Sequence, residues 1–195
     1  MTQPALATLL HWRRQMLGAG LCVCAWPGVM AADRQGKLWP LPPPSEAIVL
    51  RWEYAGGTMA PGSSAEPVLW IQADGRYSAP PSVLGGARRV GQLTREALGT
   101  LLTEIVVAQR FASLHREKIE AQIRAQAQAT GQIVLMADAG ITRLEVHLPA
   151  LHHTLELANA HAVCQQFPQI PELRRVGIIL QRLLALVEAT PIPPR

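Results

Sequence analysis

The segment from residue 132 to residue 158 carries the most regular pattern in this chain, an alternation of apolar and polar side chains. Successive side chains of a β-strand point to opposite faces, so the alternation predicts strands with one buried face. The segment can be read as one or two antiparallel hairpins. In the second hairpin we expect Leu148 to lie opposite His153, because this register gathers the apolar residues on one face. These residues are Leu144, Val146, Leu148, Leu155 and Leu157.

The same register places polar side chains on the other face, namely Glu145, His147, Thr154 and Glu156. It sets Glu145 against Glu156, and two acids that face each other destabilise an exposed strand pair modestly. A slip of one residue would set Val146 against Thr154 and mix the two faces, so we prefer the first register. The hairpin therefore supplies one core-facing surface of the fold.

Two further strands are predicted earlier in the chain, over 47–55 and 67–77. In the first strand one face would carry Ile48, Leu50, Trp52 and Tyr54, and the other Val49, Arg51 and Glu53. The dipeptide Asp74-Gly75 is a strong tight-turn signal, so the chain should reverse there. Aromatic residues gather on these strands and could line a ligand-binding face, but aromatic residues in a sheet favour the core. They are Trp52, Tyr54, Trp70 and Tyr77.

Two amphipathic helices are predicted, over 94–110 and 171–189. Thr94 suits the N-cap of the first helix, and Pro171 suits the first position of the second. Each has an apolar stripe that should face the sheet. The stripe of the first is Leu98, Leu101, Leu102, Ile105 and Val106, and that of the second includes Leu173, Val176, Ile179, Leu180, Leu183, Leu184 and Val187.

The remaining segments are weaker in pattern. The narrow apolar stripe of residues 113–129 predicts a surface helix. We also expect a short helical piece over 159–166. Residues 78–87 are rich in proline and glycine and predict a loop. We interpret the fold class as α+β, with an antiparallel sheet of four to six strands packed against the two main helices.

The N-terminal residues have the composition of a targeting signal. Arg13 and Arg14 precede an uncharged run that ends at Val29-Met30-Ala31, with compact residues where a signal peptidase cleaves. A membrane-spanning helix needs about 20 predominantly apolar residues, and this run is shorter and contains glycine and proline. We therefore predict that residues 1–31 are a signal peptide and that the mature protein is periplasmic or secreted, with no membrane span.

The arginine pair lies in the segment Trp12-Arg13-Arg14-Gln15-Met16-Leu17, which resembles a twin-arginine signal. This resemblance implies export of an already folded chain, and the general secretory route stays open as the alternative. A lipoprotein signal is a further alternative, because Cys22 and Cys24 lie in the apolar run. A lipid-attachment cysteine needs a small residue before it, and Leu21 precedes Cys22, so we interpret both cysteines as apolar residues removed with the signal.

Removal of the signal changes what composition implies. The 195 residues become 164, which suits one domain, and the formal net charge falls from +4 to +2 because two arginines and no acid are lost. A nearly neutral surface gives no electrostatic case for binding nucleic acid. Cys164 is the one cysteine left, so no intrachain disulfide is expected.

The domain boundaries follow from composition. Residues 32–46 are a proline-rich leader, expected to be an extended spacer, with a partner-binding PxxP segment as the alternative. Residues 47–190 form a single α+β domain, and 191–195 a tail. The opening of this domain, a strand, Gly-Gly, a strand and Asp74-Gly75-Arg76, resembles small uncharacterised secreted bacterial domains and contains no catalytic motif.

Histidine and cysteine side chains are concentrated in the segment 147–164, and they are good ligands for copper or zinc. The candidate metal ligands are His161, Cys164, His152 and His147. His161 and Cys164 can share a helix face. In the expected register His147 and His152 share a face only diagonally, and His153 points to the opposite face. The alternative interpretation is solvated hairpin histidines and a buried thiol.

Catalytic patterns are weak. The sequence has no Gly-x-Ser-x-Gly elbow, glycine-rich phosphate loop or dinucleotide fingerprint. Cys164 with His161 as base would need a third, orienting group. Carboxylates in or near the strands could act as acid–base pairs, but Asp74 and Asp138 each precede a turn sequence, where Asp bonds local backbone.

These observations favour an exported, non-enzymatic binding or accessory protein whose partner is an unknown protein or small ligand, with no cofactor. The alternative is a periplasmic copper- or zinc-binding protein that uses the histidines and the cysteine of residues 147–164. A hydrolase is a third hypothesis, and it predicts a concave site that joins carboxylates or Cys164 to a histidine.

Overall fold

The computed structural model describes residues 39–55, 67–80, 88–132 and 140–190. The predicted signal peptide, with Cys22 and Cys24, lies outside these ranges, and so do Asp138 and the tail 191–195.

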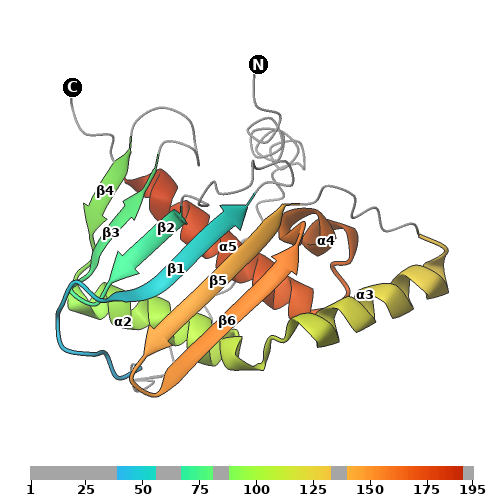
Figure 1. The fold of residues 1–195 in the computed structure, drawn as a ribbon, viewed down its shortest axis with the longest axis horizontal. Helices are drawn as coiled ribbons and strands as arrows, with labels where there is room; N and C mark the ends of the chain where they lie inside the picture. The colour runs from blue at the N-terminus through green and yellow to red at the C-terminus, as the bar shows by residue number, and fades with distance from the viewer. Residues whose placement is uncertain (1–38, 56–66, 81–87, 133–139, 191–195) are drawn as a thin grey trace, which may run out of the picture.

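A six-stranded antiparallel sheet is the framework of the domain, with strand order β4-β3-β2-β1-β5-β6 (Figure 1). Its strands are β1 (Ile48–Ala55), β2 (Pro67–Gln72), β3 (Arg76–Ala79), β4 (Arg89–Gln92), β5 (Ile141–Leu148) and β6 (Leu151–Ala158). Strand β4 is absent from the sequence-based prediction, because four residues with a central glycine are too short to show a period of two. Both β1 neighbours, β2 and β5, pair with it antiparallel.

Helices connect and cover the strands. They are α2 (Arg95–Thr103), which continues as the π-helical turn η1 (Glu104–Ala108), the 3-10 turn η2 (Phe111–Ser113), α3 (Arg116–Thr130), α4 (Ala160–Gln166) and α5 (Pro171–Ala189). Thr94 caps α2 as predicted, since its hydroxyl accepts a hydrogen bond from the backbone N–H of Ala97 at 3.1 Å. Pro171 occupies the first turn of α5, also as predicted.

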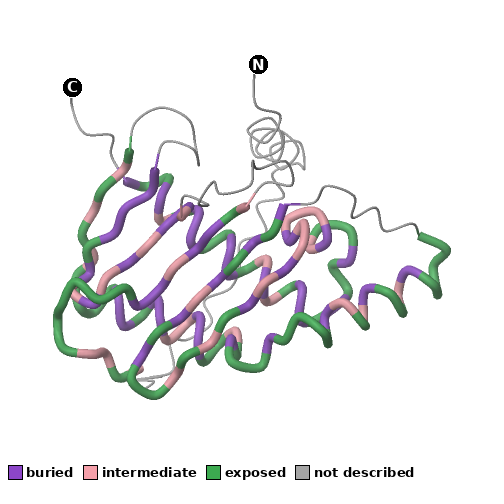
Figure 2. Tube along the Cα trace, in the orientation of Figure 1, coloured by how far each residue is buried: buried purple, intermediate pink, exposed green. Residues whose placement is uncertain are grey.

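The core lies between the sheet and the helices α2 and α5, which lie on one side of it (Figure 1). The predicted apolar stripes of both helices are buried. Figure 2 shows burial alternating along β5 and β6, where the inward side chains Leu144, Val146, Leu155 and Leu157 are each less than 5% exposed. The α+β fold with an antiparallel sheet and two main covering helices is therefore confirmed.

The register of the β5–β6 hairpin differs from the expected one by two residues. Leu148 lies opposite Leu151, not His153, and Glu145 lies opposite Thr154, not Glu156. A shift of two residues leaves every side chain on its face, so the hydrophobic pattern cannot detect it. The observed register closes the hairpin with the two residues Pro149 and Ala150, the shortest common hairpin loop, whereas the expected register needs four.

The two faces of β1 are less regular than predicted. Ile48 and Tyr54, predicted to share a face with the buried Leu50 and Trp52, are 38% and 40% exposed, while Val49 and Glu53, predicted for the other face, are buried. The pairing of β1 with β2 shifts between Ile48 and Leu50 and again between Trp52 and Glu53. Each irregularity places an extra residue on one strand, and the alternation of faces is interrupted there.

The aromatic residues of the first strands divide between core and surface. Trp52 and Tyr77 are 7% and 6% exposed and belong to the core, whereas Trp70 is half-buried and Tyr54 is exposed. The expectation of core positions therefore holds for two of the four. The hydroxyl groups of Tyr77 and Thr190 are hydrogen-bonded at 2.6 Å. This bond joins β3 to the end of α5.

The described half of the proline-rich leader is part of the domain and not a free spacer. The backbone N–H of Trp39 donates to the hydroxyl of Thr103 at 2.7 Å, and Arg95 donates to the carbonyl of Pro42 at 3.1 Å. Trp39 and Leu41 also pack against the core. The folded unit therefore includes residues from 39 onward, because apolar side chains of the leader pack against the core and its backbone is hydrogen-bonded to α2.

Over the described ranges, no single helix combines the length and apolar character needed to cross a membrane. The segments 95–113 and 116–130 satisfy such a test only when taken together, and they meet at a bend of 74°.

Candidate functional site

The structure brings together two of the predicted metal ligands, His147 of β5 and His152 of β6. They lie directly opposite each other, and not diagonally as the expected register implied. Their Nδ1 atoms are 3.3 Å apart and their ring centroids 5.5 Å apart. Both side chains are on the sheet face away from α5 and are exposed to solvent.

The other two predicted ligands, His161 and Cys164, lie on α4. The Cys164 thiol donates to the carbonyl of Leu173 in α5 at 3.3 Å, and His161 Nε2 is 3.3 Å from the side-chain amide of Gln165. Burial lowers the pKa of His161 and raises the pKa of the Cys164 thiol to about 12. The thiol is therefore protonated at neutral pH, which is the wrong state for a nucleophile or a ready metal ligand.

The two pairs do not converge. His152 is at the turn end of β6, while α4 follows the opposite end of that strand, so about 20 Å of extended chain separates them. Among the residues that the structure describes, no three His, Cys, Asp or Glu side chains are placed to hold one metal ion. The four predicted ligands therefore form two separate pairs. His147 and His152 are exposed on the sheet, and the other two lie on α4.

His153 points to the opposite face from His147, as predicted. Its Nε2 lies 2.9 Å from the carbonyl oxygen of Leu114, and its ring packs edge-on against Phe111 and His115. A hydrogen bond to a carbonyl requires a proton on Nε2, so this nitrogen is a donor. His153 is therefore occupied in joining β6 to the segment between η2 and α3.

Ion pairs connect the central strands on the same face as the histidine pair. Arg143 Nε lies 2.8 Å from Glu156 Oε1 and 3.3 Å from Glu145 Oε1. Glu53, whose side chain is 10% exposed, is paired with Arg143 and with Arg51. The three carboxylates and two guanidinium groups of this ion-pair cluster carry a net formal charge of −1.

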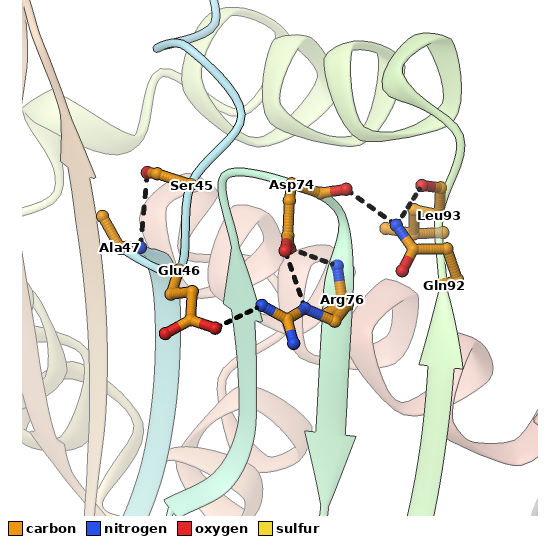
Figure 3. Close-up of polar contacts among 7 residues, drawn as sticks. All are labelled: Ser45, Glu46, Ala47, Asp74, Arg76, Gln92 and Leu93. Carbon is orange, nitrogen blue, oxygen red and sulfur yellow. Dashed lines mark hydrogen bonds and ion pairs between the residues drawn. The ribbon is translucent and has the colours of Figure 1, made fainter.

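Asp74 is a turn residue, as its sequence context predicted. Its Oδ1 accepts from the backbone N–H of Arg76 at 2.9 Å and its Oδ2 from Arg76 Nε at 2.7 Å, and Arg76 also pairs with Glu46 (Figure 3). The backbone hydrogen bond from Arg76 lowers the pKa of Asp74. The side-chain amide of Gln92 donates a hydrogen bond to the carbonyl of Asp74. These contacts join the leader, the β2–β3 turn and β4.

A groove with a volume of about 660 Å³ lies between α2 and α5. Six of its lining residues are apolar: Leu93, Ala97, Leu101, Ala185, Leu186 and Ala189. The polar ones are Thr94, Glu96, Thr100 and Arg182. Arg182 Nε lies 3.1 Å from Glu104 Oε2, and this ion pair joins the two helices near one end of the groove.

Sequence patterns did not identify this groove, because its two sides are about 90 residues apart in the chain. One available signal was the pair of small residues, Ala97 and Ala185, on the solvent-facing sides of two amphipathic helices. Small exposed residues on facing helices leave space between larger neighbours. The lining contains neither His nor Cys, so it is not the concave site that the hydrolase hypothesis predicted.

Neither models of protein families, nor curated proteins, nor solved structures gave a match to this chain.

Proposed function

We propose that this chain is an exported, non-enzymatic binding protein and that the groove between α2 and α5 receives a small, largely apolar ligand. The observation that carries this proposal is the groove itself. Its volume of about 660 Å³ falls within the range of about 300–1,000 Å³ that is usual for small-molecule sites. Six of its ten lining residues are apolar and supply contact surface, and the four polar ones can orient a ligand.

Two features support binding over catalysis. Cys164, the nucleophile candidate, has a pKa raised to about 12 by burial, so its reactive thiolate form is scarce at neutral pH. Asp74, the best placed carboxylate in a turn, has its oxygens engaged by Arg76. Both side chains therefore serve the fold, and the groove offers apolar surface with no nucleophile–base pair in its lining.

Binding can be tested with the fluorescent probe 8-anilinonaphthalene-1-sulfonate, which becomes bright on transfer to an apolar site. We expect saturable fluorescence in the native protein and its loss in Ala185→Phe, because the new ring would fill the groove. Ala185 is exposed, so the substitution leaves the core intact. The matched control is Ala125→Phe, at an exposed alanine of α3 that does not line the groove. Equal fluorescence in the two variants would contradict the proposed site.

Export is tested separately, with the signal itself. We expect the protein in the periplasmic fraction to begin after Ala31, and the double variant Arg13→Lys, Arg14→Lys to stay in the cytoplasm if the twin-arginine route is used. Mass spectrometry of the fractionated protein gives the start of the chain. An exported chain that keeps Met1 would contradict the predicted cleavage.

A further inference from the structure

We infer that His147 and His152 form a two-histidine chelating site for one divalent ion of the zinc or copper class. This site is distinct from the groove, because the neighbours of His147, Val146 and Leu148, are buried in the core, so His147 and its partner point to the other face of the sheet, away from the groove helices. It also differs from the four-ligand set considered from the sequence, because neither His161 nor Cys164 contributes.

The strand register brings the two histidine side chains together. The backbone N–H of Asn159 donates to the carbonyl of Gly140, so these residues are a hydrogen-bonded pair of the extended ladder. Hydrogen-bonded and non-hydrogen-bonded pairs alternate along an antiparallel ladder, which makes His147 and His152 a non-hydrogen-bonded pair. In such pairs the two Cα atoms are about 4.5 Å apart and the side chains come closest. The backbone therefore holds the two rings together.

The separation of the ring nitrogens matches that of two imidazoles bound to one ion. Zinc–imidazole bonds are about 2.0–2.1 Å long, so two of them at a tetrahedral angle place the nitrogens about 3.3–3.4 Å apart. The Nδ1 atoms of His147 and His152 are 3.3 Å apart. The spacing of the two nitrogens thus suits one bound ion once each ring turns its lone pair toward it, and imidazole is a preferred ligand of zinc and copper.

A carboxylate lies beside the other nitrogen of the His147 ring. Glu145 Oε2 lies 3.5 Å from Nε2 of His147, and Arg143 holds the other oxygen of this carboxylate at 3.3 Å. A carboxylate beside Nε2 favours a proton on that nitrogen, which leaves Nδ1 of His147 with a lone pair directed at His152. Carboxylate–histidine–metal arrangements use the same order of groups.

Ion binding requires one proton to move. With His147 accepting at Nδ1, the hydrogen bond between the rings is donated by Nδ1–H of His152. The ion takes the place of that proton, which moves to Nε2 of the same ring, so both imidazoles stay neutral. Water fills the remaining coordination positions, since His147 is 42% exposed and His152 is exposed too.

The test is calorimetric titration of the purified protein with zinc chloride, and with magnesium chloride as a comparison ion. We expect one zinc ion per chain and no magnesium binding, because magnesium prefers oxygen ligands. His147→Gln and His152→Gln should each weaken zinc binding by about tenfold or more, and the double variant should add little to the weaker single variant. His161→Gln is the matched control and should bind zinc as the wild type does.

Retained zinc affinity in either single variant, or an equal loss in His161→Gln, would overturn the site. Glu145→Gln tests the positioning role of the carboxylate, with an expected loss of about tenfold in zinc affinity. Long-range nitrogen–proton spectra provide the second readout, since His147 should then lose its preference for the Nε2–H tautomer in the metal-free protein. Ala185→Phe should leave zinc binding unchanged, so failure of this site and failure of the groove are distinguishable.

Discussion

Replacing Gly75 with alanine tests the turn that joins β2 to β3. Gly75 has a φ of +92°, a conformation that L-residues rarely adopt. A Cβ added there would lie 2.3 Å from the carbonyl oxygen of Leu93, which is backbone and cannot rotate away. Leu93 directly follows β4, and its N–H donates a 2.9 Å hydrogen bond to the carbonyl of Gly75.

The expected cost of Gly75→Ala has two parts. The left-handed backbone costs an L-residue about 1–2 kcal/mol. Relief of the clash must move Leu93 by about 1 Å, which breaks its hydrogen bond and adds about 0.5–1.5 kcal/mol. The total is about 1.5–3.5 kcal/mol, and at about 2–4 °C per kcal/mol for a domain of this size the Tm should fall by about 3–14 °C.

Gly131→Ala is the matched control for this prediction. Gly131 also has a positive φ, +67°, but no atom lies within 4 Å of its added Cβ. Gly131→Ala should therefore lose only the free energy that a left-handed backbone costs an L-residue. Both substitutions lower the conformational entropy of the unfolded chain by the same amount, so this effect cancels in the comparison. Urea denaturation and thermal melting of the two variants measure the difference. A Gly75→Ala protein no less stable than Gly131→Ala would refute the reasoning.

Other outcomes follow from single contacts. Tyr77→Phe removes the buried hydrogen bond to Thr190 and should lower the unfolding free energy by about 0.5–1.5 kcal/mol in urea titrations, whereas an unchanged midpoint would show that the bond contributes nothing. The hydrogen bond from Lys118 lowers the pKa of Glu172 below its ordinary value of 4.5, so the stability it provides is present above pH 4.5 and is lost as the pH falls through the lower folded value. Lys118→Met should therefore flatten the acid side of the stability–pH curve, and a curve like that of the wild type would contradict this. Cys164, with its pKa raised to about 12, should react with a thiol reagent at pH 8 only after urea unfolds the protein, and rapid labelling of the native state would show that it is accessible.

Much of the fold was predictable from the sequence because local physics determines it. Thr94 caps α2 through a side-chain hydrogen bond three residues away, and Asp74 closes its turn through Arg76, two residues away. The faces of β5 and β6 follow from the alternation of apolar and polar residues, because burial of one face is the dominant energy. Contacts of this short range are encoded in neighbouring residues and need no knowledge of the rest of the chain.

The candidate sites depended on distances that local patterns do not contain. The expected hairpin register kept both faces correct and still separated His147 from His152 by two residues, because hydrophobic burial is the same after a shift of two. The two-residue turn at Pro149 and the pairing of Arg143 with Glu156 distinguish the registers.

The groove and the packing of residues 39–46 against the domain also depend on tertiary structure. The side formed by Ala97 and the side formed by Ala185 meet only when α2 and α5 pack on the same side of the sheet. Trp39 finds its partner Thr103 some 64 residues along the chain. The sequence by itself determined the helices α2 and α5 and the buried faces of β5 and β6, since these depend on near neighbours. The tertiary structure decided which side chains meet, because those contacts depend on how distant elements pack.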